Sequence, residues 1–261
     1  AFYQVTNLKG KELNDIKTLY SSSLLGLLCF YNIRNDHLTI KINGIDYLFT
    51  KVFFEIKNKC IVDIAPSNID ILLLGKNINS DKPTLFFLES KFSEYLKTGT
   101  REVSIVYHNI YKNNYKGVFE KTGINYSDPS PQKTRNDNKH KLVVTIGDNT
   151  HYCEGLKQMI SHHIGIKNLL NDNIHKETIR RIPEIINDIK SYEVLLGTIV
   201  YKFENDLAAF DDYKNIYEKM AESMPDQDRI KMVDSLLTYQ EVFKNYPLQQ
   251  SIKSYYNLQQ D

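Results

Sequence analysis

Two short apolar segments joined by a turn-rich stretch constrain the fold of this chain more than any other feature. Residues 69–74 (IDILLL) and 84–89 (TLFFLE) have the length of buried strands. Residues 75–83 (GKNINSDKP) between them supply glycine, asparagine, aspartate and proline, the residues typical of turns. We therefore predict that the two segments form a buried antiparallel hairpin.

The elements predicted around this hairpin are helices and further strands. They are a helix over residues 11–31, strands 38–42 and 45–56 joined by Asn43-Gly44, one or two helices within 92–120, a strand at 142–146, a helix over 150–170 with Thr150 as its N-cap, a helix over 176–190 and a strand at 194–201. Residues 121–141 are predicted to be an exposed loop, and helices are expected over 206–222 and 227–245, divided by Pro225. This order indicates a single α/β domain with a central mixed sheet flanked by helices, comprising a core of about 11–202 and a C-terminal helical extension, 204–261.

The composition is that of an ordinary globular protein. Hydrophobic residues make up 41% of the 261 residues and charged residues 25%, which excludes intrinsic disorder for the chain as a whole. The 33 basic and 32 acidic residues leave a net charge of +1, so no global field attracts nucleic acid or anionic lipid. Binding to a polyanion must therefore come from a local patch, such as the basic residues within 132–141.

The cysteines and the apolar stretches bear on the cellular compartment. Cys29, Cys60 and Cys153 are far apart and form neither a CxxC pair nor a disulfide framework. We expect reduced, buried thiols and hence a cytoplasmic protein. The longest apolar stretch, residues 24–31, is much shorter than the roughly 20 residues that span a bilayer, so no membrane association is expected.

Charged residues lie at one end of the predicted hairpin. Asp70 opens the first strand, and Glu89 and Lys91 close the second. Because the start of one antiparallel strand lies beside the end of the other, the two carboxylates should be neighbours. Glu89 and Lys91 are two positions apart and should point to the same face of the sheet. Neighbouring carboxylates repel, and Mg²⁺ offsets that repulsion, so this pattern indicates a phosphodiesterase site in which Lys91 orients or deprotonates a water or stabilises charge on phosphate.

These residues resemble a known superfamily. The pattern Pro66-x-x-x-Asp70, an apolar strand and then Glu89-x-Lys91 resembles the PD-(D/E)XK nucleases, which have the restriction-endonuclease-like fold. The strings 66-PSNIDILLL-74 and 85-LFFLESKFSEYL-96 are similar to bacterial branches of that superfamily, and 154-EGLKQMISHHIG-165 resembles the helix that follows their catalytic hairpin. The resemblance covers about residues 11–201 and is sharpest over 66–96. One departure is that Pro66 and Asp70 are not adjacent.

The resemblance implies a Mg²⁺-dependent nuclease that cuts DNA, with Mn²⁺ as a substitute for Mg²⁺. Asp70, Glu89 and the Ser90 carbonyl would bind the metal, Lys91 would assist the attacking water, and Gln158 would face the site. Many nucleases that cut both strands are dimers, so a homodimer is also considered.

A further acid often comes from the first helix or a nearby strand in these nucleases. Glu12 and Glu55 are the candidates, and the sequence does not choose between them.

Three alternatives compete with this prediction. The acids and the lysine can form a structural ion-pair cluster, and a nuclease-like fold can bind nucleic acid or a protein partner without cutting it. The chain can also serve in assembly through its C-terminal helices. A zinc site at His162 and His163 is not favoured, because adjacent helical residues point about 100° apart and no HExxH motif is present.

Overall fold

A computed structural model describes residues 21–58, 60, 67–96, 101–126, 139–146, 149–151, 154–171 and 189–258. The main sheet is mixed and has the strand order β1-β2-β3-β4-β9-β10, with β11 also pairing with β9. The pairs from β1 to β4 are antiparallel, whereas β9 runs parallel to β4, β10 and β11. The strands are β1 (Leu38–Ile42), β2 (Ile45–Asn58), β3 (Ser67–Asn77), β4 (Pro83–Lys91), β9 (Glu193–Val200), β10 (Lys231–Met232) and β11 (Leu237–Thr238).

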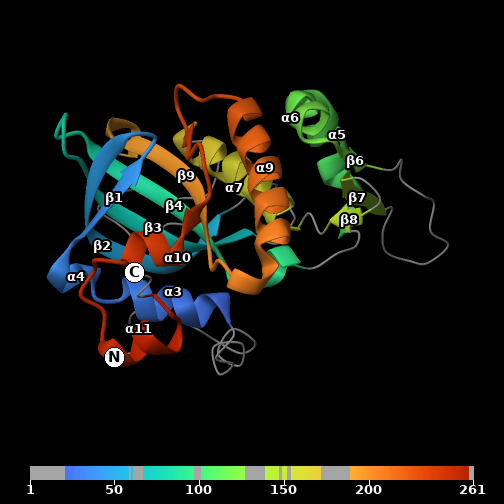
Figure 1. The fold of residues 1–261 in the computed structure, drawn as a ribbon. Coiled ribbons are helices and arrows are strands. Elements are labelled where there is room, and N and C mark those ends of the chain that lie inside the picture. The colour runs from blue at the N-terminus through green and yellow to red at the C-terminus, as the bar shows by residue number, and fades with distance from the viewer. Residues whose placement is uncertain are drawn as a thin grey trace.

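Helices cover both faces of this sheet (Figure 1). On one face lie α3 (Ser22–Phe30), α10 (Tyr239–Phe243) and α11 (Gln250–Tyr255), and the other face packs against α7 (Glu154–Leu170) and α9 (Leu207–Ser223). Each face of the sheet has its own hydrophobic core, and alternate residues of the β3–β4 hairpin point into one or the other. Leu72 and Phe87 face α7, whereas Leu73 and Phe86 face α3 and α10. The predicted α/β class with a central mixed sheet is therefore confirmed.

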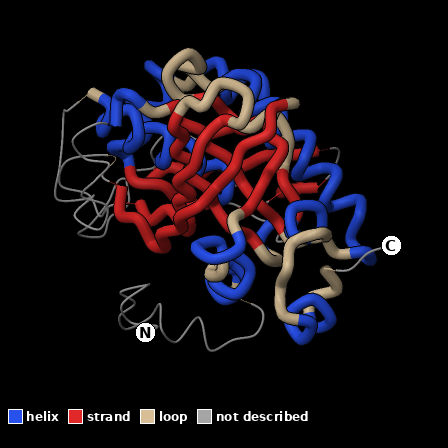
Figure 2. The backbone as a smooth tube through the Cα atoms, turned by 90° about the vertical axis from the view of Figure 1, so that its left-hand side faces the viewer, coloured by secondary structure: helices blue, strands red, loops and turns tan. Residues whose placement is uncertain are grey.

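The two predicted hairpins are present; β1 has the predicted bounds, and β2, β3 and β4 are longer than predicted. Asn43 and Gly44 both have positive φ, 50° and 80°, as the tight turn between β1 and β2 requires. In the second hairpin Leu72 pairs with Phe87 and Gly75 with Thr84. The tube in Figure 2 shows these strands as one layer, with helices on its two sides. Short helical turns complete this part of the chain: α4 (Ile33–Asp36) and η1 (Glu94–Leu96).

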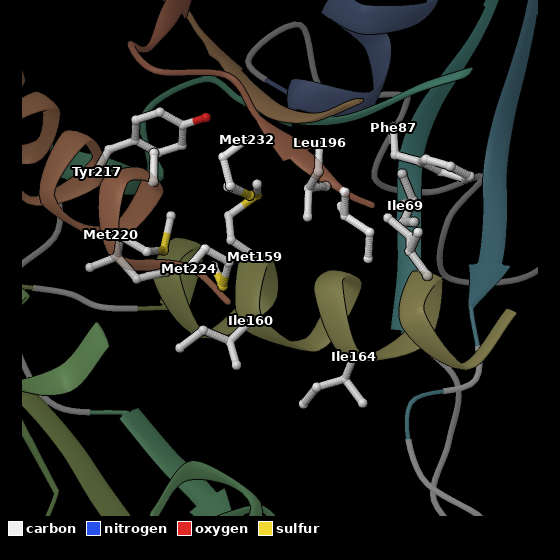
Figure 3. Close-up of a cluster of buried hydrophobic side chains, with 14 of the residues drawn as sticks. Ile69, Phe87, Met159, Ile160, Ile164, Leu196, Tyr217, Met220, Met224 and Met232 are labelled. Atoms are coloured by element: carbon white, nitrogen blue, oxygen red, sulfur yellow. The ribbon is translucent and has the colours of Figure 1, made fainter. Parts of the chain in front are cut away.

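The hydrophobic core on the second face of the main sheet is built around α7. In Figure 3, Met159 points from α7 toward Leu196 and Met232 of the sheet, and Met220 and Met224 approach it from the α9 side. Helix 150–170 is thus present, but it begins at Glu154. Thr150 is not its N-cap, because Asn149–His151 forms β8.

A second, smaller sheet has the order β5-β7-β6, with β8 pairing with β7. Its strands are β5 (Arg101–Ser104), β6 (Ile124–Tyr126), β7 (Lys139–Ile146) and β8, and it is accompanied by α5 (Ile105–Asn114) and α6 (Lys116–Thr122), which confirm the helices expected within 92–120. The loop predicted over 121–141 is wrong at both ends, because α6, β6 and β7 enter that range. Residues 127–138, with Lys133 and Arg135 of the basic patch, and residues 172–188, with most of the helix expected at 176–190, lie outside the described residues. The other two lysines of the patch, Lys139 and Lys141, belong to β7.

The C-terminal residues differ most from the prediction. Helix 206–222 is present as α9, and η3 (Ile189–Ser191) and η4 (Glu204–Asp206) flank β9. The helix predicted over 227–245 is present only at Tyr239–Phe243, as α10. Residues 227–238 form turns and the two short strands β10 and β11, which add to the main sheet beside β9. Buried residues such as Tyr217, Ile230 and Tyr239 then join the two central cores, so residues after 204 are an integral part of the fold rather than a helical extension.

Cys29 and Cys60 are free and buried, as expected, and Cys153 lies outside the described residues. None of the helices in the described part of the chain has the length and apolar character needed to cross a membrane.

Candidate functional site

The β3–β4 hairpin brings the predicted acids together. Ile71 pairs with Leu88, so Asp70 and Glu89 follow one another at the same end of the two strands. Asp70 Oδ2 accepts a hydrogen bond of 2.7 Å from the Ser90 backbone N–H. The backbone pairing of β3 with β4 ends at Ile71 and Leu88, and beyond it the Asp70 side chain, instead of a backbone carbonyl, accepts the hydrogen bond from the Ser90 N–H.

Glu89 lies at the centre of a buried polar chain. Lys91 Nζ donates to Glu89 Oε1 at 2.6 Å, which confirms that both side chains point to one face. His162 Nε2 lies 2.7 Å from Glu89 Oε2, and His162 Nδ1 lies 2.9 Å from Ser67 Oγ. Glu89 is 1% exposed, Lys91 7% and His162 0%, so these charges and hydrogen bonds are shielded from water.

This environment fixes the charges of Glu89 and Lys91. Burial pushes the pKa of Glu89 upward, but the Lys91 ammonium and His162 outweigh that effect and lower the pKa to about 2. Burial also lowers the pKa of Lys91, but Glu89, Asp70 and Glu94 together raise it well above its ordinary value. Glu89 is therefore ionised and Lys91 protonated at neutral pH.

Asp70 is in the opposite situation. Burial raises its pKa well above the ordinary value, and the charges of Glu89 and Glu55 add to this shift. Lys91 and the hydrogen bond from the Ser90 N–H lower the pKa, but they do not outweigh the other effects. An ionised Asp70 is thus unfavourable as the site stands, and a cation beside it would relieve that cost.

The structure places Glu55 at this site. Phe54 pairs with Ile71 and Ile56 with Ile69, so Glu55 of β2 lies opposite Asp70 of β3. Glu55 has a positive φ of 54°, which is unusual for a residue other than glycine, asparagine or aspartate. The other candidate, Glu12, lies outside the described residues.

Ser90 and Gln158 are the remaining predicted site residues, and they lie on β4 and α7. The Ser90 side chain points to the opposite face of the sheet, where its hydroxyl contacts the Ser22 carbonyl at 3.1 Å and the Tyr239 hydroxyl at 2.6 Å. Only the main chain of Ser90 therefore belongs to the acid cluster. Gln158 lies one turn before His162 on α7, next to Met159, which contacts Thr198 beside Glu89.

Two buried polar side-chain atoms, one on α7 and one on α9, lack hydrogen-bond partners within the described part of the chain. Gln158 Oε1 and the Tyr213 hydroxyl are inaccessible to water and make no hydrogen bond with any described residue. Tyr213 is close enough to Lys91 and Glu89 for both charges to influence its pKa, which burial raises. Buried polar atoms usually find a partner, so the Tyr213 hydroxyl is an unsatisfied group close to the charges of Glu89 and Lys91.

The donor set fits a hard divalent cation in part. Asp70, Glu55 and Glu89 carry carboxylate oxygens, the ligands that Mg²⁺ prefers, and the pKa of Asp70 is raised first by burial and then by the charges of Glu89 and Glu55. Both oxygens of Glu89 are already engaged, by Lys91 and by His162, so metal binding requires one of these contacts to lengthen. Within the described ranges, three or more acids, cysteines or histidines do not form a preassembled metal cluster.

Sequence reasoning missed His162, Ser67 and Tyr213. Ser67 carried no signal of its own, and His162 was considered only as a zinc ligand. The available signal was the spacing of Gln158 and His162, which places both residues on one face of a helix. Their contact partners on β3 and β4 depend on how α7 packs against the sheet, which the sequence does not specify.

Comparisons with known proteins do not assign this chain to a family. No protein-family model matches it, and neither the curated proteins nor the solved structures contain a significant match.

Proposed function

We propose that this protein is a Mg²⁺-dependent deoxyribonuclease of the restriction-endonuclease-like kind. The observation that carries the proposal is the convergence of Asp70, Glu89 and Lys91 at one end of the β3–β4 hairpin, where two of the three are almost fully buried. Further support comes from the chain order, in which a helix and antiparallel strands precede the acids and α7 and β9 follow them. The choice of DNA as the substrate, a restriction or defence role, a homodimer and a cytoplasmic location follow from the resemblance and the composition.

Asp70, Glu89 and the Ser90 carbonyl would hold the metal, and Glu55 is the additional acid available beside them. When bound there, Mg²⁺ supplies a Lewis acid that polarises the phosphodiester and activates a water. Lys91 is protonated because of its pairing with Glu89. We therefore assign Lys91 to orienting water and stabilising negative charge on the phosphate, not to abstracting a proton.

The test measures metal binding and DNA cleavage with one set of variants. Mn²⁺ and Mg²⁺ are titrated calorimetrically into the wild type and the Asp70→Asn, Glu89→Gln double variant, and cleavage of supercoiled plasmid is followed for Lys91→Ala. We expect the double variant to lose metal binding and Lys91→Ala to lose cleavage while DNA binding persists. Equal metal affinity in wild type and double variant, or cleavage by Lys91→Ala at the wild-type rate, would contradict the proposal.

The same hairpin offers a matched control at its other end. Lys76 Nζ and Asp81 Oδ1 form an ion pair of 2.6 Å there, with side chains that are 49% and 78% exposed. Lys76→Ala and Asp81→Asn remove the same types of charge from the same hairpin. We expect both variants to bind metal and to cleave DNA like the wild type.

A second candidate function is binding without cleavage, to nucleic acid or to a protein partner. The observation that favours it is the engagement of both Glu89 oxygens by Lys91 and His162, which a purely structural network would also show. A protein that binds plasmid DNA with equal affinity with and without Mn²⁺, and leaves it intact, would establish this function in place of the first.

A further inference from the structure

We propose that His162 is a positioning residue of this site: it fixes the orientation of the Glu89 carboxylate, and Ser67 fixes the orientation of His162. This inference rests on the proposed function and adds two residues that act on the metal ligand rather than on the metal. Three consecutive contacts carry it, from Lys91 to Glu89 (2.6 Å), from Glu89 to His162 (2.7 Å) and from His162 to Ser67 (2.9 Å).

The hydrogen positions in this chain follow from the charge of Glu89. Glu89 Oε1 accepts from the Lys91 ammonium, and an ionised carboxylate paired in this way only accepts hydrogen bonds, so His162 Nε2 must carry the hydrogen that it shares with Oε2. In a neutral imidazole, Nδ1 is then the acceptor and the Ser67 hydroxyl donates to it. Ser67 thus favours the tautomer that presents N–H to Glu89.

The consequence is a carboxylate held from two sides. Lys91 approaches Oε1 from the same strand, whereas His162 approaches Oε2 from a helix packed against the sheet and is fully buried. Without His162, the carboxylate would be free to rotate about its terminal torsion while remaining paired with Lys91. Ligating carboxylates are usually hydrogen-bonded in this way, and loss of such a partner typically lowers metal affinity or activity by about 10- to 100-fold.

His163 supplies an internal control. It neighbours His162 on α7 and is equally buried, but its Nδ1 contacts the Tyr115 hydroxyl at 2.8 Å and its Nε2 contacts the Pro225 carbonyl at 3.0 Å. These partners lie on the α6 and α9 side of the molecule and do not touch Glu89. A change at His163 therefore reproduces the loss of a buried histidine with two hydrogen bonds, without changing the acid cluster.

The experiment compares His162→Leu with His163→Leu in the full chain. Free energies of unfolding are measured by urea denaturation, and Mn²⁺ dissociation constants by electron paramagnetic resonance of the free ion. We expect both leucine variants to lose stability, but only His162→Leu to bind Mn²⁺ about 10- to 100-fold more weakly. His162→Gln keeps an amide N–H donor for Glu89 and should recover part of the affinity, whereas Ser67→Ala should show a smaller loss of the same kind.

The outcomes separate this inference from the proposed function. If the wild type binds no Mn²⁺ with or without DNA, both are overturned. If the wild type binds Mn²⁺ but His162→Leu and His163→Leu weaken binding equally, the positioning role alone is overturned. Should His162→Leu fail to fold, Ser67→Ala decides the question, because it keeps His162 but removes the hydroxyl partner of Nδ1. An Mn²⁺ affinity of Ser67→Ala equal to that of the wild type would then exclude the orienting role.

Discussion

Replacing Glu89 by glutamine should destabilise the protein by about 3 kcal/mol at neutral pH. Glutamine has nearly the size of glutamate, so the change removes charge without opening a cavity. Its amide can accept from Lys91 or from His162, but its NH₂ group then opposes the other donor. The Lys91 ammonium, 7% exposed, loses its nearest negative charge, and removing one partner of a buried ion pair typically costs about 3–5 kcal/mol.

The pKa of Glu89 gives a second route to the same magnitude. A fall from its ordinary value of 4.5 to about 2 corresponds to about 3 kcal/mol of preferential stabilisation of the charged form. Because the folded-state pKa is depressed, this stability is present above pH 4.5 and is lost as the pH falls toward 2. The difference in unfolding free energy between wild type and Glu89→Gln should therefore shrink as the pH falls from 4.5 to about 2. Protonation of the other acids affects both proteins equally and cancels in this difference.

The assay is urea unfolding at neutral pH combined with thermal melts. A loss of about 3 kcal/mol lowers the melting temperature of a chain of this size by roughly 6–12 °C. Lys91→Met should also destabilise the protein, and the double variant should lose less than the sum of the two single losses, because the partners remove one another's uncompensated charge. Asp81→Asn in the exposed ion pair should change stability far less than Glu89→Gln does. The coupling between the buried Glu89 and Lys91 would be refuted if Glu89→Gln lost no more stability than Asp81→Asn. It would also be refuted if the stability losses of Glu89→Gln and Lys91→Met simply added up in the double variant.

Two further predictions concern the same hairpin. Asp70→Asn keeps an acceptor for the Ser90 N–H but removes a charge whose pKa is raised, so it should stabilise the metal-free protein by on the order of 1 kcal/mol at neutral pH. The raised folded-state pKa means that this gain disappears as the pH falls below the ordinary value of 3.8, and a variant less stable than wild type in neutral urea titrations would contradict it. Gly75→Ala should cost about 3 kcal/mol or more in the same titration, because a Cβ there would overlap the Leu48 carbonyl oxygen and lie 2.7 Å from Phe49 Cα. Gly117→Ala has open space around its Cβ and should leave stability unchanged or slightly raised, and equal effects of the two alanines would count against the close approach of β2 and β3.

Local signals in the sequence account for the parts of the fold that were predicted correctly. Asn43-Gly44 specifies a tight turn by its backbone preferences, and the apolar runs of β3, β4 and β9 are long enough to identify buried strands. The side-by-side position of Asp70 and Glu89 follows from the hairpin alone. These features depend on residues that are close in sequence, which is why they could be derived before the structure.

The incorrect parts depend on contacts between distant residues. Strands β10 and β11 have two residues each, too few to show a period of two, and exist because β9 offers an edge for parallel pairing. Thr150 resembles an N-cap locally, but pairing of Thr150 with Thr145 places it in β8 instead. His162 reaches Glu89 across 73 positions of sequence, so its role could be identified only from the packing of α7.

The two ends of the β3–β4 hairpin show why stability alone is a poor explanation for the acid cluster. At one end, Lys76 and Asp81 form their ion pair in solvent, where desolvation costs little. At the other end, Glu89, Lys91 and His162 are withdrawn from water, and Asp70 beside them is unfavourable in its charged form. Apolar side chains of similar volume often replace a buried ion pair with no loss of stability or with a gain, and the neighbouring positions of both strands are already Leu, Ile and Phe. The hairpin thus places one ion pair in water and withdraws Glu89 and Lys91 from water at its other end. Stability is a weak explanation for the buried pair, and this agrees with the proposal that the acids bind a cation.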